Sequence, residues 1–146
     1  MIKKSLFSFI ALLLLLPVAY AGKSPIFSTS DGAIRGHDPV AYFTEGNPTK
    51  GSDQYTFEWK GETFKFASAE NLALFKGNPE KYAPQYGGYC AYAVSEGSTA
   101  STVPEAWTIV DGKLYLNYSL GVKKRWAKNI SGRIATADKN WPGVLN

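Results

Sequence analysis

Five aromatic side chains alternate with polar residues between positions 55 and 66, and this alternation constrains the fold more than any other stretch of the chain. The aromatic residues are Tyr55, Phe57, Trp59, Phe64 and Phe66. Because successive side chains of a strand point to opposite faces, a period of two predicts two strands, joined through Lys60-Gly61-Glu62. The aromatic rings would share one face of this antiparallel hairpin, and the polar residues the other.

Helical signals follow the hairpin directly. Ser68 stands at the N-cap position of a helix that Gly77 ends. The pair Asn78-Pro79 begins a second, short helix, which stops before Pro84. The first hairpin is therefore followed by two helices.

A second hairpin and a helical region are predicted after residue 106. Asp111-Gly112 is a dipeptide typical of two-residue hairpin turns, and apolar runs lie on both sides of it. Ser119 can cap the helix that follows, and Gly132 is predicted to interrupt that helix. Its apolar stripe consists of Val122, Trp126 and Ile130. Together these patterns predict a single α+β domain, with a small antiparallel sheet from two hairpins packed with several short helices.

The N-terminal residues have the pattern of a signal peptide. Lys3 and Lys4 precede an apolar run over residues 6–16, and small residues follow up to Ala21. The run is shorter than the roughly 20 residues that a membrane-spanning helix needs. We therefore expect cleavage after Ala21 and export to the periplasm or the medium, with no integral membrane segment in the mature protein.

Residues 22–35 are interpreted as an N-terminal extension and residues 36–146 as one domain, which we expect to be monomeric. Without the two lysines of the signal peptide, 14 basic residues stand against 12 acidic ones, so the formal charge falls from +4 to +2. The cluster Lys123-Lys124-Arg125 is typical of a solvated helix face. Nothing in this pattern indicates a nucleic-acid-binding surface.

The stretch from Tyr86 to Val94 contains the single cysteine of the chain, Cys90. A lone cysteine cannot form an internal disulfide, so Cys90 is buried, metal-bound, reactive or paired with another molecule. Free cysteine is among the residue types most often found buried. Burial is therefore the simplest expectation for Cys90.

Several spaced motifs resemble the YHS domain, a small module found in metal-linked contexts. These motifs are Asp38-Pro39-Val40, the hairpin that ends in Phe66, the helix from Ser68 to Phe75, and Asn78-Pro79-Glu80-Lys81-Tyr82. The longer run from Gly36 to Trp141 looks like the exported, free-standing branch of this family. The resemblance implies a binding protein with a link to a transition metal such as copper.

The thiol positions of the metal-associated members are empty in this chain. Those members read roughly Asp-Pro-Val-Cys and Phe-Cys-Ser-x-x-Cys, whereas this chain has Ala41, Ala67 and Asn71 at the three positions. Cys90 is the one soft ligand left.

Cys90 and the sole histidine, His37, support two hypotheses. The leading one is a two-coordinate Cu(I) site, because soft thiolate suits that ion and two ligands are too few for a closed zinc site. The other is a cysteine-dependent enzyme with Cys90 as nucleophile and His37 as base. None of the local signatures of cysteine hydrolases is present, which favours a binding protein over an enzyme.

A third hypothesis is a module that binds a small apolar or aromatic ligand. Its pocket would be lined by Tyr86, Tyr89, Tyr92 and Trp107. The residues from Ser95 to Glu105 are rich in Ser, Thr, Gly and Pro, and they are predicted to form a mobile loop over this pocket.

Overall fold

The computed structural model describes residues 22–146, and the predicted signal peptide, residues 1–21, lies outside this range. The strands are β1 (Ser28–Thr29), β2 (Gly32–Ala33), β3 (Ser52–Trp59), β4 (Glu62–Phe66), β5 (Trp107–Val110) and β6 (Lys113–Leu116). The α-helices are α1 (Ala41–Thr44), α2 (Ala69–Gly77), α3 (Pro79–Tyr82), α4 (Ala91–Ser95), α5 (Leu120–Ala127) and α6 (Ile130–Asn140). Short 3₁₀ turns cover Ile34–Gly36, Gln85–Gly88 and Gly143–Leu145.

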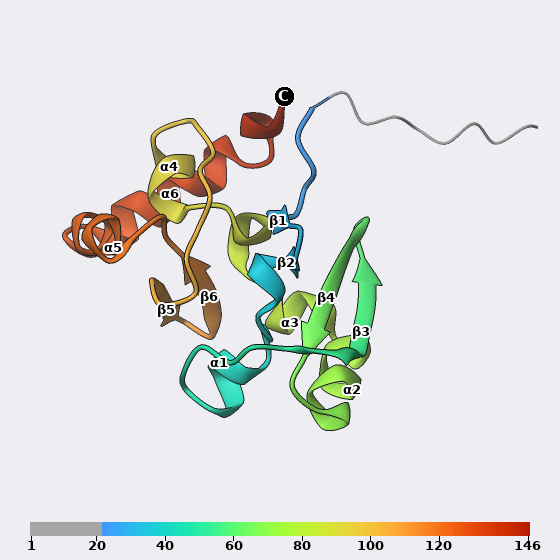
Figure 1. Cartoon of the computed structure of the whole chain (residues 1–146). Coiled ribbons are helices and arrows are strands. Elements are labelled where there is room, and N and C mark those ends of the chain that lie inside the picture. The colour runs from blue at the N-terminus through green and yellow to red at the C-terminus, as the bar shows by residue number, and fades with distance from the viewer. Residues whose placement is uncertain (1–21) are drawn as a thin grey trace, which may run out of the picture.

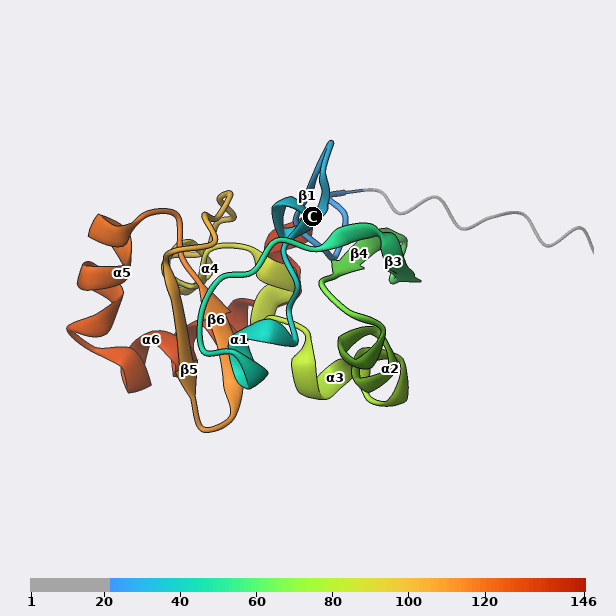
Figure 2. The ribbon, with the colours of Figure 1, turned by 60° about the horizontal axis from the view of Figure 1, so that its bottom comes forward.

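The elements form two halves of one domain (Figures 1 and 2). One half contains β3, β4 and α2, and the other contains β5 and β6 with α4, α5 and α6. The α+β class is confirmed. The two predicted hairpins and the short β1–β2 pair are three separate two-stranded antiparallel sheets.

The first hairpin has the predicted strands, turn and aromatic face. Phe57 lies opposite Phe64, and both residues of the turn, 60–61, have positive φ, as a tight two-residue hairpin requires. Phe64 and Phe66 are fully buried against Phe75 of α2, with ring centroids 5.0 and 5.1 Å from it. Helix α2 therefore covers the aromatic face of the hairpin.

The predicted serine caps are confirmed, but the predicted break in the C-terminal helix is wrong. Ser68 and Ser119 each accept a hydrogen bond at 3.1 Å from the backbone N–H three residues later. The helix breaks before Asn129 rather than at Gly132, because Asn129 Oδ1 accepts a hydrogen bond from the Gly132 N–H and caps α6. None of the helices in residues 22–146 combines the length and the apolar character that crossing a membrane requires.

The N-terminal segment, residues 22–35, packs between the two halves. Ile26 belongs to the core beside the first hairpin, and the Phe27 N–H donates a hydrogen bond of 2.9 Å to the Gly87 carbonyl. Gly87 has φ of 62°, and a β-carbon there would overlap the Pro25 carbonyl oxygen. Glycine is therefore required at position 87 both for its backbone conformation and for space.

The loop predicted to be mobile is anchored. Residues 96–105 contain no helix or strand, yet Thr102 is buried and its hydroxyl donates a 2.7 Å hydrogen bond to the Gly88 carbonyl. The Ala100 carbonyl accepts a 3.0 Å hydrogen bond from the Cys90 N–H. Polar composition predicted mobility here, but these long-range hydrogen bonds hold the loop against the start of α4.

Candidate functional site

Cys90 lies immediately before α4 and is buried, with 1% of its surface exposed. Its thiol donates to Asn117 Oδ1 at 3.5 Å and accepts from the Tyr118 backbone N–H at 3.3 Å. Burial raises the pKa of the Cys90 thiol, and nearby backbone N–H groups oppose this only in part. The side chain is therefore a protonated thiol at neutral pH, whereas nucleophilic attack and metal binding need the thiolate.

Asn117 holds Cys90 and the start of α4 in place through its side-chain oxygen. The Asn117 side chain is fully buried, and its Oδ1 also accepts a 3.0 Å hydrogen bond from the Tyr92 backbone N–H. Because a backbone N–H can only donate, this bond fixes the orientation of the amide. Its Nδ2 has no hydrogen-bond partner in residues 22–146. Cys90 is thus part of a structural junction between the end of β6 and the start of α4.

His37 contacts Arg35 and Lys50. It is half-buried, its Nδ1 lies 3.2 Å from the Arg35 carbonyl oxygen, and its backbone pairs with Lys50 in an isolated β-bridge. Across residues 22–146, no group of three or more His, Cys, Asp or Glu side chains is positioned to hold a metal ion. A two-ligand site made of His37 and Cys90 stays a prediction.

The Asp38 side chain links the start of α1 to the start of α2 through hydrogen bonds. Its carboxylate is fully buried and accepts four hydrogen bonds. Oδ1 accepts from the Val40 and Ala41 N–H groups at 2.8 and 3.2 Å, and Oδ2 accepts from the Ala67 N–H and Asn71 Nδ2, each at 2.8 Å. Ala41, Ala67 and Asn71 stand at the positions where the resemblance led us to look for thiols. Ala41 and Ala67 hold the carboxylate through their backbone N–H groups, and Asn71 holds it through its side chain.

The four aromatic residues predicted to line one pocket are divided between two core clusters, with Tyr86, Tyr89 and Tyr92 in one and Trp107 in the other. Tyr86 and Tyr89 pack on Trp141, with ring centroids 6.0 and 6.2 Å from it, and both hydroxyls donate hydrogen bonds within the protein. Trp107 packs against a different core cluster. Tyr92 is the member of this set that lines an open groove. All four therefore contribute to packing, and Tyr92 also lines the groove.

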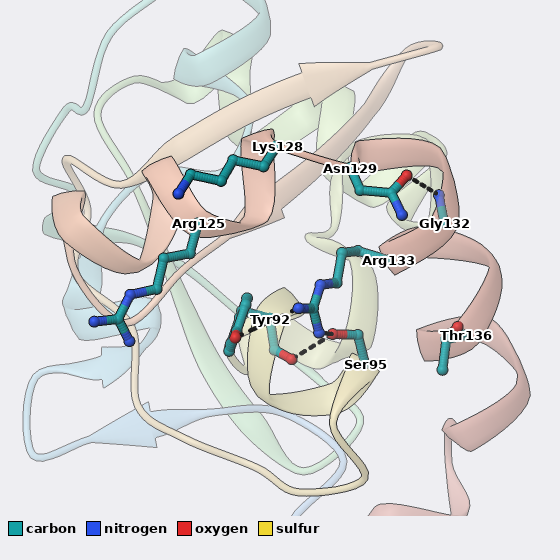
Figure 3. A pocket seen from close by; sticks show the side chains of 8 residues that line it. All are labelled: Tyr92, Ser95, Arg125, Lys128, Asn129, Gly132, Arg133 and Thr136. Carbon is teal, nitrogen blue, oxygen red and sulfur yellow. Dashed lines mark hydrogen bonds between the residues drawn. The ribbon is translucent and has the colours of Figure 1, made fainter.

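The groove beside Tyr92 is lined by cations (Figure 3). It lies between α4, α5 and α6 and has a volume of about 610 Å³. Its lining residues are Tyr92, Ser95, Arg125, Lys128, Asn129, Gly132, Arg133 and Thr136. Three of them carry a positive charge and none is a carboxylate. We call this feature the cationic groove.

Arg133 is held in place by α4. Its guanidinium carbon lies 4.2 Å from the centroid of the Tyr92 ring, a cation–π arrangement. Nη1 donates to Ser95 Oγ at 3.2 Å and Nη2 to the Tyr92 hydroxyl at 3.4 Å. The Glu96 carboxylate also pairs with the guanidinium, and this hydrogen bond raises the pKa of Arg133. The groove therefore contains a pre-positioned, permanently charged guanidinium.

Arg125 near the end of α5 and Lys128 just after it also line the groove, and Figure 3 shows their charged ends on the side away from the Arg133 guanidinium. Both are exposed, and neither has an ion-pair partner within residues 22–146. The sequence pattern assigned Arg125 to a solvated helix face, and it gave no reason to connect that run with Tyr92. The connection depends on α4 packing against both α5 and α6, for which the sequence contains no local signal.

Comparison with known proteins identifies one part of the chain. A model of the YHS domain matches residues 40–86, the span that runs from just before α1 to Tyr86. No curated protein and no solved structure is significantly similar to the chain. All the residues that line the cationic groove lie outside the matched residues.

Proposed function

We propose that this chain, which contains a YHS domain over residues 40–86, is an exported binding protein that takes a small anion into the cationic groove. One observation carries the proposal: Arg125, Lys128 and Arg133 line one groove that contains no lining carboxylate. A concave surface with charge of one sign attracts and concentrates ligands of the opposite sign. The formal charge of only +2 after signal-peptide removal makes this local concentration of cations more significant.

The lining favours an oxyanion, such as a carboxylate or a phosphate. Guanidinium groups offer planar pairs of N–H donors that match these groups, and Lys128 adds a compact point charge. Asn129 and Thr136 supply neutral polar groups at the same groove. These side chains are suited to fixing the orientation of a ligand that the cations attract.

Copper binding at His37 and Cys90 has weaker support. The YHS match is compatible with a metal-associated family. A Cu(I) ion at Cys90 would have to reach a buried thiol and displace its proton, which removes the hydrogen bond that the thiol donates to Asn117. The open groove imposes none of these costs on an anion.

Export is supported by the sequence alone, through Lys3, Lys4 and the apolar run that follows them. The intact mass of the protein recovered from the periplasmic fraction tests it. A processed chain would begin at Gly22, and a chain that still begins at Met1 would contradict export by cleavage.

Calorimetric titration with citrate and with inorganic phosphate, at low ionic strength, tests the anion site. The decisive variant is Arg125→Gln with Lys128→Gln, which removes two lining charges. Each exposed charge contributes modestly, so we expect the pair to weaken binding about fivefold. We also expect the affinity of the unchanged protein to fall as salt is added.

The matched control is Lys123→Gln with Lys124→Gln. It removes the same charge from the same helix but from outside the groove lining, so it should change affinity less than about twofold. If both double variants lose the same affinity for the anion, the anion is attracted by the overall positive charge of the helix and not by a site in the groove. Absence of binding to both probes would refute the proposal.

A further inference from the structure

In the structure, Glu96 forms an ion pair with one of the three cations that line the groove, Arg133. Its carboxylate pairs with the guanidinium of Arg133, and the two side chains are 53% and 28% exposed. Glu96 follows the last residue of α4, at the edge of the cationic groove, and is not among the lining residues. A carboxylate of the protein itself therefore already accepts a hydrogen bond from the guanidinium that lines the groove.

The position of Arg133 does not depend on Glu96. The Tyr92 ring lies under the guanidinium, and Ser95 Oγ and the Tyr92 hydroxyl accept two of its hydrogen bonds. If the Glu96 carboxylate moved away, these contacts would keep the guanidinium facing the groove. The Nη1 N–H that donates to Glu96 would then be free for another oxyanion.

Glu96 itself is held weakly. Arg133 is the hydrogen-bond partner of its carboxylate within residues 22–146, and more than half of the side chain is exposed. An exposed ion pair gains little, because water screens the charges and a long side chain loses rotamer freedom. Moving this side chain into solvent therefore costs less than removing a buried group.

We infer that Glu96 is a resident competitor, which occupies Arg133 in the free protein and is displaced when an anionic ligand enters the groove. This inference rests on the anion site proposed above. An anion with one charged group would only exchange one oxyanion for another at Arg133, with little net gain. Arg125 and Lys128 line the same groove, so a ligand whose second charged group extends to either of them gains a further ion pair, and we expect the groove to select polyanions over monoanions.

Substitution of the competitor tests this selection. Calorimetric titrations with citrate and with acetate would compare the unchanged protein with Glu96→Gln. We expect citrate to bind more tightly than acetate, and Glu96→Gln to tighten citrate binding about two- to fivefold. Glu105→Gln, which removes an exposed carboxylate outside the groove lining, should leave the affinity nearly unchanged. Thermal melts would verify that both variants are folded.

Displacement can also be observed directly. In ¹³C spectra, the carboxyl signal absent from Glu96→Gln identifies Glu96, and we expect it to shift as citrate is added and to reach a plateau with the binding isotherm. A Glu96 signal that stays fixed while citrate binds would overturn the inference and leave the anion site intact. If the Arg125 and Lys128 double variant binds citrate as tightly as the unchanged protein, the anion site itself fails.

Discussion

Asp38→Asn is the most informative test of how the first half of the fold is held together. The carboxylate accepts four hydrogen bonds, two at each oxygen. An asparagine has one acceptor oxygen and one NH₂ group, so whichever way the amide is turned, two donors face another donor. Losing two bonds to a charged acceptor costs about 1.5 to 3 kcal/mol each, or about 3 to 6 kcal/mol together.

Part of this loss is recovered, because a neutral amide is cheaper to bury than a carboxylate. We therefore expect a net destabilisation of about 3 kcal/mol, a large fraction of the 5 to 15 kcal/mol that stabilises a typical domain. In a protein of this size, that loss would lower the melting temperature by about 10 °C.

Urea unfolding followed by tryptophan fluorescence measures the effect, with Asp53→Asn as the control. Asp53 is exposed and pairs with Lys65 at 2.8 Å on the surface, so the same substitution there should leave the unfolding midpoint nearly unchanged. Adding Asn71→Asp to Asp38→Asn should restore part of the lost stability, because the donor and the acceptor simply exchange places. Equal midpoints for Asp38→Asn and Asp53→Asn would refute the argument.

Two further predictions concern the second half of the chain. Gly87→Ala should destabilise the fold by about 2 kcal/mol or more, because its β-carbon would overlap the Pro25 carbonyl. The control is Gly46→Ala, which is also at positive φ but in open space, and it should lower the free energy of unfolding by less in the same urea experiment. Cys90 should react with Ellman's reagent only as fast as the protein unfolds, and Cu(I) competition should give the same result for the unchanged protein and Cys90→Ala. Rapid labelling under native conditions, or one equivalent of Cu(I) lost in Cys90→Ala, would instead support the copper hypothesis.

Local patterns in the sequence were sufficient for both hairpins and for two helix starts. The alternation around Phe57 and Phe64 depends on nearest neighbours along the strands, and Ser68 and Ser119 cap through a hydrogen bond spanning three residues. The helix break was misplaced because both Asn129 and Gly132 are signals for an interruption. The side-chain cap of Asn129 decided the outcome, and Gly132 was accommodated inside α6.

The features that matter most for the site depend on residues far apart in the chain. Asp38 meets Ala67, just before α2, and Asn71, within α2, some thirty residues away, and Arg133 meets Tyr92 across 41 residues. Neither pairing has a spacing that a reader of the sequence could recognise. Aromatic residues were equally ambiguous, because rings such as Tyr86 have the same appearance in sequence whether they fill a core or line a pocket.

The position of the N-terminal segment shows that the limits of the family match differ from the limits of the folded unit. The family match begins at residue 40 and ends at Tyr86, one residue before the glycine that bonds to Phe27. Ile26 fills the core of the matched half, and the Lys23 N–H meets the Leu145 carbonyl at 2.9 Å near the other end of the chain. The stretch that the family model matches is thus smaller than the unit that packs together in this structure. A piece cut at the edges of the match would leave an open apolar seam where residues 22–35 now run.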